Sequence, residues 1–123
     1  MNAFTVTGLG FGDEGKGKST DYLSLVHQAE WNIRHNGGSQ AYHNVHRQGG
    51  KHHAFRQIGS GSFNEFVKTM LGPEMLIDPL SLDLEAKDFD TKTGGKVLNR
   101  VYASADALVI TPFHMAVNRL REM

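Results

Sequence analysis

The sequence predicts an α/β fold with a mainly parallel sheet, a P-loop-like strand–loop–helix unit at the N-terminus and one β-hairpin. Three observations predict it. Residues 3–7 alternate Phe and Val with Thr and run into a glycine-rich loop followed by a helical pattern. Gly49 and Gly50 separate two segments of extended character, as in a hairpin. Short apolar runs then alternate with helix starts of the Asp-Pro and Thr-Pro type.

In the N-terminal half, each expected element follows from a local pattern. Residues 3–7 should form a strand inside the sheet, and apolar residues at helical spacing predict a helix over 20–28. A second short strand is expected over 31–34, ending in a glycine turn. Residues 45–55 should form the hairpin, with its return strand continuing through Ile58.

In the C-terminal half, one stretch supports two interpretations. The apolar residues between Phe63 and Met70 have helical spacing, yet a strand is favoured over 67–71. The remaining expected elements are a strand over 75–77, a helix over 79–88, a mobile polar loop over 87–96, an element at 97–102, a strand over 108–110 and a helix from Pro112. The core-facing residues expected on the two helices are Leu80, Leu84 and Ala86, then Phe113, Ala116, Val117 and Leu120.

Length and composition bound the class of protein. A chain of 123 residues with 39% hydrophobic content is expected to form a single domain over 1–123. Thirteen basic and thirteen acidic side chains leave no net charge, which excludes a general nucleic-acid or membrane-surface binder. The absence of cysteine excludes disulfides and fits a reducing cytoplasm. No apolar run is long enough for a membrane span, and no signal peptide is expected.

The glycine-rich loop is the main candidate for chemistry. From Gly12 the sequence satisfies the P-loop pattern G-x-x-x-x-G-K-[ST]. Backbone N–H groups of such a loop and of the following helix N-terminus can cradle phosphate. The alternative is a turn in which glycine serves only the backbone angles. The flanking elements and the lysines favour phosphate binding.

Six of the seven histidines lie between His27 and His53. A metal site could use His43, His46, His52 and His53. However, no pair has the spacing of ligands on a helix together with a third ligand. A polar hairpin surface is therefore the favoured interpretation over a zinc site.

Two motifs resemble the adenylosuccinate synthetase family. Residues 12–18, followed by Asp21 and Leu23, look like the family's signature loop. Residues 36–43 resemble its second motif, which usually reads Gln-Gly-Gly-x-Asn-Ala-Gly-His. Fainter similarity continues to Arg121. Family members are much longer, so the resemblance covers only their N-terminal part.

The resemblance implies a ligase that joins L-aspartate to IMP with GTP hydrolysis, through a 6-phosphorylated intermediate. It implies Asp13 as catalytic base and His43 as catalytic acid, with Mg²⁺ held by Asp13 and the Tyr42 carbonyl. The nucleotide- and phosphate-binding residues that it implies are Gly12, Asp13, Glu14, Gly15, Lys16, Gly17, Lys18, Gln40, Ala41, Tyr42 and His43. Two of these depart from the family pattern: Gln40 stands for Asn and Tyr42 for Gly.

Other functions stay open at this point. Phage members of the family make 2-aminoadenylosuccinate from dGMP, but they typically replace the catalytic aspartate, so Asp13 favours IMP. In the family, guanine recognition, the aspartate loop and the IMP-binding arginines lie beyond the position of Met123. Activity would then need these residues or a partner, and a truncated, non-catalytic nucleotide-binding regulator is the alternative. A simple P-loop NTPase is a third reading. Self-association, as a homodimer, is also expected.

Overall fold

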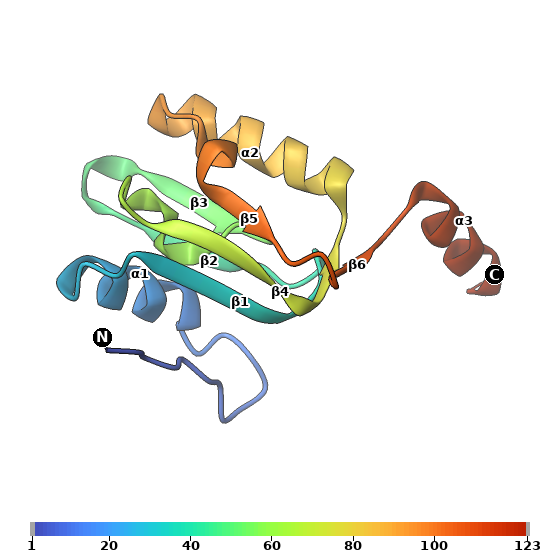
Figure 1. Cartoon of the computed structure of the whole chain (residues 1–123), viewed down its shortest axis with the longest axis horizontal. Coiled ribbons are helices and arrows are strands. Elements are labelled where there is room, and N and C mark those ends of the chain that lie inside the picture. Colours follow the sequence, from blue (N-terminus) through green and yellow to red (C-terminus); the bar gives the residue numbers. More distant parts are fainter. Residues whose placement is uncertain (1, 123) are drawn as a thin grey trace.

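The computed structural model describes residues 2–122 and shows an α/β fold (Figure 1). Its helices are α1 (Lys16–Val26), α2 (Pro79–Thr93) and α3 (Pro112–Arg121). Its strands are β1 (Trp31–Gly37), β2 (His43–His46), β3 (His52–Phe55), β4 (Lys68–Ile77), β5 (Val101–Ala103) and β6 (Leu108–Val109). Short 3-10 turns lie at Gln48–Gly50, Ser60–Phe63 and Val97–Arg100.

The main sheet is parallel and centred on β4. Strand β4 pairs with β1 on one side, and with β5 and then β6 on the other. Strands β2 and β3 form a separate antiparallel hairpin in which His43 pairs with Phe55. The expected fold class, a mainly parallel sheet with one hairpin, is confirmed. The return strand of the hairpin ends at Phe55 rather than continuing to Ile58.

Strand β4 is longer than expected. Two strands, over 67–71 and 75–77, were expected, whereas one strand runs across both. Pro73 has no N–H group for a ladder, but the register with β1 shifts at this point: Arg34 pairs with Leu71 and Asn36 with Glu74. Three residues of β4 thus span the interval that two residues of β1 cover. This bulge accommodates the proline inside the strand.

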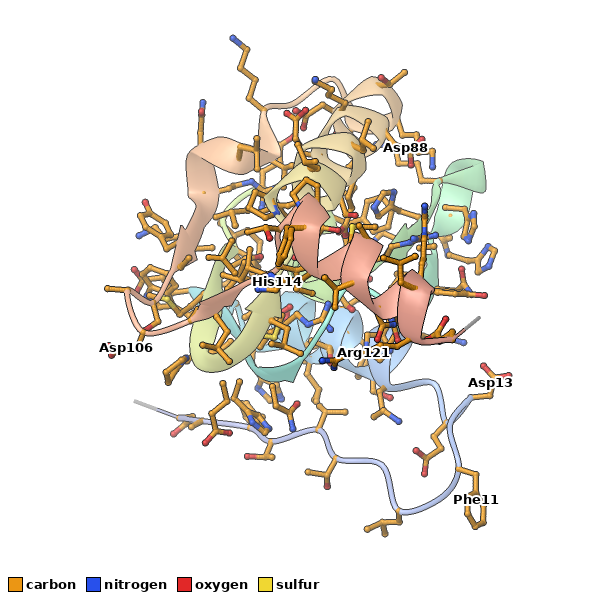
Figure 2. All side chains as sticks on the ribbon, turned by 90° about the vertical axis from the view of Figure 1, so that its right-hand side faces the viewer. Phe11, Asp13, Asp88, Asp106, His114 and Arg121 are labelled. Carbon is orange, nitrogen blue, oxygen red and sulfur yellow. The ribbon has the colours of Figure 1, made fainter. Side chains whose placement is uncertain are left out.

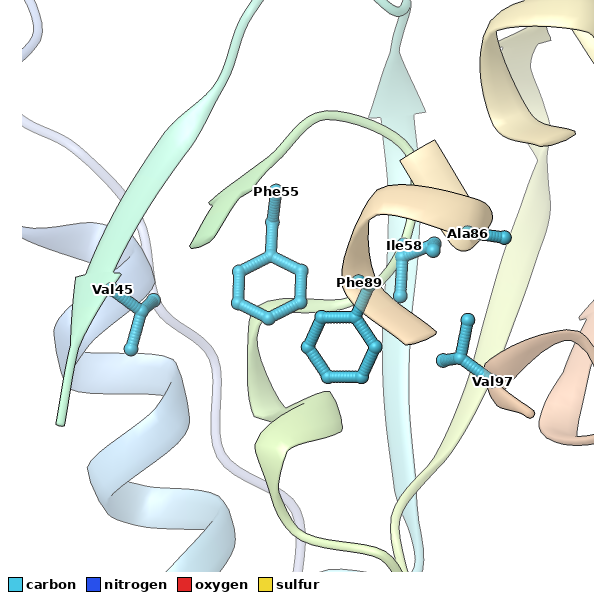
Figure 3. Close-up of a cluster of buried hydrophobic side chains, with 6 residues drawn as sticks. All are labelled: Val45, Phe55, Ile58, Ala86, Phe89 and Val97. Carbon is cyan, nitrogen blue, oxygen red and sulfur yellow. The ribbon is translucent and has the colours of Figure 1, made fainter. Parts of the chain in front are cut away.

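The core lies between α2, the hairpin and the sheet. Figure 3 shows its largest cluster, in which Phe55 of the hairpin lies beside Phe89 of α2. Its members are Val45, Phe55, Ile58, Ala86, Phe89 and Val97. The aromatic rings of Phe55 and Phe89 are tilted, with centroids 5.5 Å apart. A second cluster, Leu71, Met75 and Ile77, lines the core-facing side of β4.

The inward face of α2 differs from the expected one. Ala86 is buried as expected, but Leu80 and Leu84 are 61% and 67% exposed. The buried positions are instead Glu85, Ala86 and Phe89. Leucines on both sides of the helix made its apolar side ambiguous, and the packing of Phe89 against the hairpin decides which side faces the core.

The expected mobile loop over 87–96 is wrong for most of its length. Helix α2 continues to Thr93 and ends at Gly94, whose φ of 76° is left-handed. Its polar side chains form ion pairs one turn apart, Asp83 with Lys87 and Asp88 with Lys92. The polar composition therefore belongs to the solvent-facing side of a helix.

Asp78 caps α2 as the Asp-Pro pattern predicted. Its carboxylate accepts the N–H groups of Leu80 and Ser81, both at 3.1 Å, and the Ser81 hydroxyl at 2.6 Å. The hydroxyl bond, followed by the Ser81 and Leu80 N–H groups, lowers the pKa of Asp78. The carboxylate form of Asp78 is thus the capping form.

We expect Asp78→Ala to lower the free energy of unfolding by about 1 kcal/mol at neutral pH, because it removes this cap. The folded-state pKa of Asp78 is lowered, so the difference between variant and wild type is present above the unfolded pKa of the group. It shrinks as the pH falls through the folded value. Urea titrations at pH 7 and in acid measure it. An equal difference at both pH values would contradict the charged cap.

The two ends of the chain depart from expectation. Residues 3–7 form no strand, and Phe4 is 50% exposed, stacked on His27. Among the described strands β1 pairs only with β4, so its outer edge is free, but residues 3–7 do not pair with it. Alternation predicts which face a strand would bury, not whether the segment pairs. Figure 1 shows the N-terminal segment running apart from the sheet.

Helix α3 begins where expected but buries nothing. The Thr111 side chain accepts the N–H of His114, and the His114 ring accepts the N–H of Thr111, a capping box. The expected core stripe is exposed, with Phe113 at 73% and Leu120 at 72%. Figure 1 shows why: α3 projects from the sheet on an extended segment. No helix within residues 2–122 has the length and apolar content to cross a membrane.

Candidate functional site

Helix α1 starts directly at the glycine-rich loop. It begins at Lys16, four residues earlier than expected, after Gly15 with a φ of 73°. Lys16, Gly17 and Lys18 therefore form the first turn, where backbone N–H groups lack helical partners. Left-handed backbone at Gly12 (φ 112°) and Asp13 (φ 53°) bends the loop toward this turn. The sequence pattern thus produces a helix N-terminus that can receive an anion.

The loop already surrounds one oxyanion, the carboxylate of Glu14. Glu14 Oε1 accepts the N–H of Leu9 at 2.8 Å and of Gly10 at 2.6 Å, and Oε2 accepts from Lys16 Nζ at 2.8 Å. The bond from Lys16, followed by that from Gly10, lowers the pKa of Glu14. The donor set of this loop therefore favours negatively charged oxygen.

A cavity of about 170 Å³ opens beside the first turn of α1. Its walls come from α1, the C-terminal part of β1 and the start of β2. The lining residues are Val6, Lys16, Gly17, Thr20, Ile33, Arg34, His35, Asn36, His43 and Ser60. Ligands of open α/β sheets bind outside the carboxyl ends of parallel strands, and this cavity lies at that end of β1.

His43 is held against α1 by the absence of a side chain at Gly17. A Cβ on Gly17 would lie 2.6 Å from His43 Cβ and 3.3 Å from Ser60 Oγ. Burial, then the charges of Arg34 and Lys16, hold the pKa of His43 below its ordinary value. The imidazole is therefore neutral at neutral pH and offers one N–H donor and one acceptor.

The structure brings some of the expected site residues together and leaves others apart. Lys16, Gly17 and His43 share the cavity, whereas Asp13 does not line it. Figure 2 shows Asp13 near Phe11 on the outer bend of the N-terminal loop. Gly12, Glu14 and Gly15 belong to this loop, and Lys18 follows on α1.

The second motif lies in the connection between β1 and β2. Gln40, Ala41 and Tyr42 are exposed, and the Tyr42 ring lies 5.7 Å from the Arg56 guanidinium. The tyrosine that replaces the family glycine thus points its ring to the surface side of this connection.

Arg34 is a cavity residue that the sequence reasoning missed. It lies two positions before the second motif, where residues 31–34 were read only as strand. An arginine at the end of an apolar strand, directly before a glycine turn, was the available signal.

Metal ligands are not clustered in the described part of the chain. Within residues 2–122 no group of three or more His, Asp or Glu side chains could hold an ion. His46 and His52 stack at 4.1 Å, while His53 is 2% exposed. The hairpin surface interpretation is right for the first two and wrong for His53. Asp13 is an exposed oxygen donor near an anion-binding loop, which fits Mg²⁺ bound jointly with phosphate oxygens.

Comparisons with known proteins point to one family. The family profile of adenylosuccinate synthetase matches residues 5–123. The chain is 40% identical to the adenylosuccinate synthetase of Saccharopolyspora erythraea, over 99% of this chain and 28% of that protein. It is 35% identical to that of Rhodococcus erythropolis, again over 99% and 28%.

Two solved structures share the fold. The fully ligated adenylosuccinate synthetase of Plasmodium falciparum superposes with a TM-score of 0.76 at 32% identity, covering 90% of this chain and 24% of that one. Succinoaminodeoxyadenylate synthetase of cyanophage S-2L, bound to dGMP and to dATP as an energy donor, gives 0.70 at 19% identity, over 89% and 30%. The second likeness concerns the fold alone.

The chain spans 28% of the length of the curated relatives named above. Within that span, the profile runs through the loop, the cavity and the hairpin to the last residue. The chain therefore belongs to the adenylosuccinate synthetase family.

Proposed function

We propose that this chain supplies the phosphate-binding part of an adenylosuccinate synthetase, which joins L-aspartate to IMP at the expense of GTP. The observation that carries the proposal is the convergence of the α1 N-terminus, Lys16 and a neutral His43 on one cavity. Such a site can hold a phosphoryl group and donate a hydrogen bond to it.

The proposed chemistry needs two steps, because the carbonyl oxygen of IMP is a poor leaving group. Asp13 takes the N1 proton of IMP while O6 attacks the γ-phosphorus of GTP, and GDP leaves. The aspartate amine then attacks C6, the C6–O6 bond breaks, inorganic phosphate departs and the amine loses a proton. His43 donates a ring N–H to a transferring phosphoryl oxygen, and Lys16 and Lys18 balance its charge.

The family uses Mg²⁺, which would be held here by the Asp13 carboxylate and the Tyr42 carbonyl and would neutralise phosphate charge. Asp13 lies on the exposed loop, so the loop must fold toward the cavity for Asp13 to reach the base. The loop N–H groups that donate to Glu14 in this structure could donate to phosphate instead. Their binding of phosphate would favour that closure. We place the reaction in the cytoplasm.

The second candidate is a nucleotide-binding module without turnover. The position of Asp13 favours it, because this carboxylate does not line the cavity that Lys16 and His43 share.

An assay of adenylosuccinate formation tests both candidates. The purified chain, combined with a second polypeptide that carries the family residues beyond its span, should form product from GTP, IMP, aspartate and Mg²⁺. Asp13→Ala should abolish this turnover while GTP binding persists. Asp106→Ala, which changes an exposed carboxylate of the β5–β6 connection, is the matched control and should keep the wild-type rate. Nucleotide binding without product would support the module. Absence of both would refute the phosphate site.

A further inference from the structure

Arg34 carries a buried guanidinium nitrogen, Nη1, that has no hydrogen-bond partner among the described residues. It lies in β1 opposite Leu71 and lines the cavity together with Lys16 and His43. Among residues 2–122 its Nη1 is shielded from solvent, and the N–H groups on it donate to no acceptor. A buried guanidinium nitrogen in this state costs free energy, so an oxygen ligand there would be strongly favoured.

The carboxylate whose charge acts on Arg34, that of Glu85, forms its hydrogen bonds with other groups. Burial lowers the pKa of Arg34, and the negative charge of Glu85 opposes that effect. However, the Glu85 carboxylate accepts the N–H groups of Arg56 and Gln57 at 2.8 Å and of Ile58 at 3.2 Å. Glu85 therefore balances the charge of Arg34 from a distance without supplying its hydrogen bonds.

The cavity itself selects for negative charge. Lysine, arginine and histidine side chains line it, together with the first turn of α1, and no Asp or Glu of the described chain does. A guanidinium presents its donors in a planar fork that matches two phosphoryl oxygens. Because Nη1 of Arg34 has no hydrogen-bond partner, its N–H groups are available to a ligand in the cavity.

We propose that Arg34 is a phosphoryl-binding residue of this cavity, which completes the cradle formed by Lys16 and the α1 N-terminus. The inference rests on the proposed function and deepens it, because it adds a phosphoryl-binding side chain from β1 to the site. The ligand is a phosphoryl group of a purine nucleotide. It comes either from the terminal phosphates of GTP or from the monophosphate IMP.

Calorimetric titrations with pyrophosphate, GTP and IMP test the assignment on wild type, Arg34→Gln, Arg34→Lys and Arg119→Gln. Arg119→Gln removes the same charge from an exposed position on α3 and should bind like wild type. Arg34→Gln should weaken binding of the contacted ligand about tenfold or more, the effect of a lost charge-assisted hydrogen bond. Arg34→Lys should retain only part of the wild-type affinity, because an ammonium group cannot donate two parallel hydrogen bonds as a guanidinium does.

The pattern of losses identifies the source of the phosphoryl group. Weaker binding of pyrophosphate and GTP alone assigns Arg34 to the triphosphate. A loss confined to IMP assigns it to the monophosphate. Equal affinities in wild type and both Arg34 variants overturn the inference while leaving the proposed function intact. If the wild type binds none of the three ligands, both the inference and the proposed function are refuted.

The guanidinium signals of Arg34 in NMR spectra add a readout that a purely structural arginine would not move. Pyrophosphate should shift these signals in the wild type, because its oxygens accept from the N–H groups of Nη1. If Arg34→Gln fails to fold, Arg34→Lys decides: wild-type affinity in this variant overturns the inference.

Discussion

Replacing Glu85 by alanine is expected to lower the free energy of unfolding by about 3–5 kcal/mol. Only 3% of the Glu85 side chain is exposed to solvent. Its carboxylate accepts the backbone N–H groups of three consecutive residues, 56–58. Alanine leaves these donors buried without an acceptor and leaves Arg34 without its counter-charge. Urea unfolding followed by circular dichroism measures the loss.

Glu85→Gln and Asp83→Ala complete this experiment. Glutamine keeps one carbonyl oxygen as an acceptor, but its NH₂ group faces backbone N–H donors. We therefore expect an intermediate loss in the free energy of unfolding. Asp83 lies on the same helix and pairs with exposed Lys87, and its removal should change stability by less than about 1 kcal/mol. A Glu85→Ala variant as stable as Asp83→Ala would show that the segment 56–58 is held by other contacts.

Replacing Gly17 by alanine is expected to destabilise the protein by about 1–3 kcal/mol, although alanine is the better helix former. The new Cβ would overlap His43 Cβ at 2.6 Å and approach His43 Cα at 3.4 Å. These atoms are fixed by the backbone of β2, so a rotamer change cannot relieve the overlap. Helix α1 and β2 must separate, which moves His43 in the cavity wall.

Gly95→Ala is the matched control for this clash. The nearest atom to a Cβ there is Thr93 Oγ1 at 3.7 Å, and the residue does not have left-handed backbone angles. We expect stability within about 0.5 kcal/mol of wild type. Urea midpoints and the ring signals of His43 in NMR spectra should change in Gly17→Ala alone. Unchanged His43 signals in that variant would contradict the close packing of α1 on β2.

Local chemistry allowed several elements to be predicted. Asp78-Pro79 and Thr111-Pro112 start helices because a side-chain oxygen caps free N–H groups and proline needs none of its own. Gly49 and Gly50 turn the hairpin because both adopt positive φ values, 80° and 77°. The phosphate-binding pattern likewise depends on residues that are neighbours in the chain.

Contacts between distant segments could not be predicted in the same way. The strand over 3–7 was expected from alternation alone, but these residues pair with no described strand, although the outer edge of β1 is free. The apolar stripe of α3 has correct helical spacing, yet no surface of the described chain packs on Phe113 or Leu120. Burial depends on a second element, which a one-dimensional pattern does not specify.

By itself the sequence determined the family, the loop that can hold an oxyanion and the helix starts, because each depends on side chains a few residues apart. Only the tertiary structure decided that His43 rests on Gly17, that Glu85 is committed to the 56–58 backbone and that Nη1 of Arg34 lacks a partner among the described residues. Hydrogen-bond satisfaction and close packing are properties of groups brought together in space. In this chain they depend on residues of α1, α2, β1 and β2.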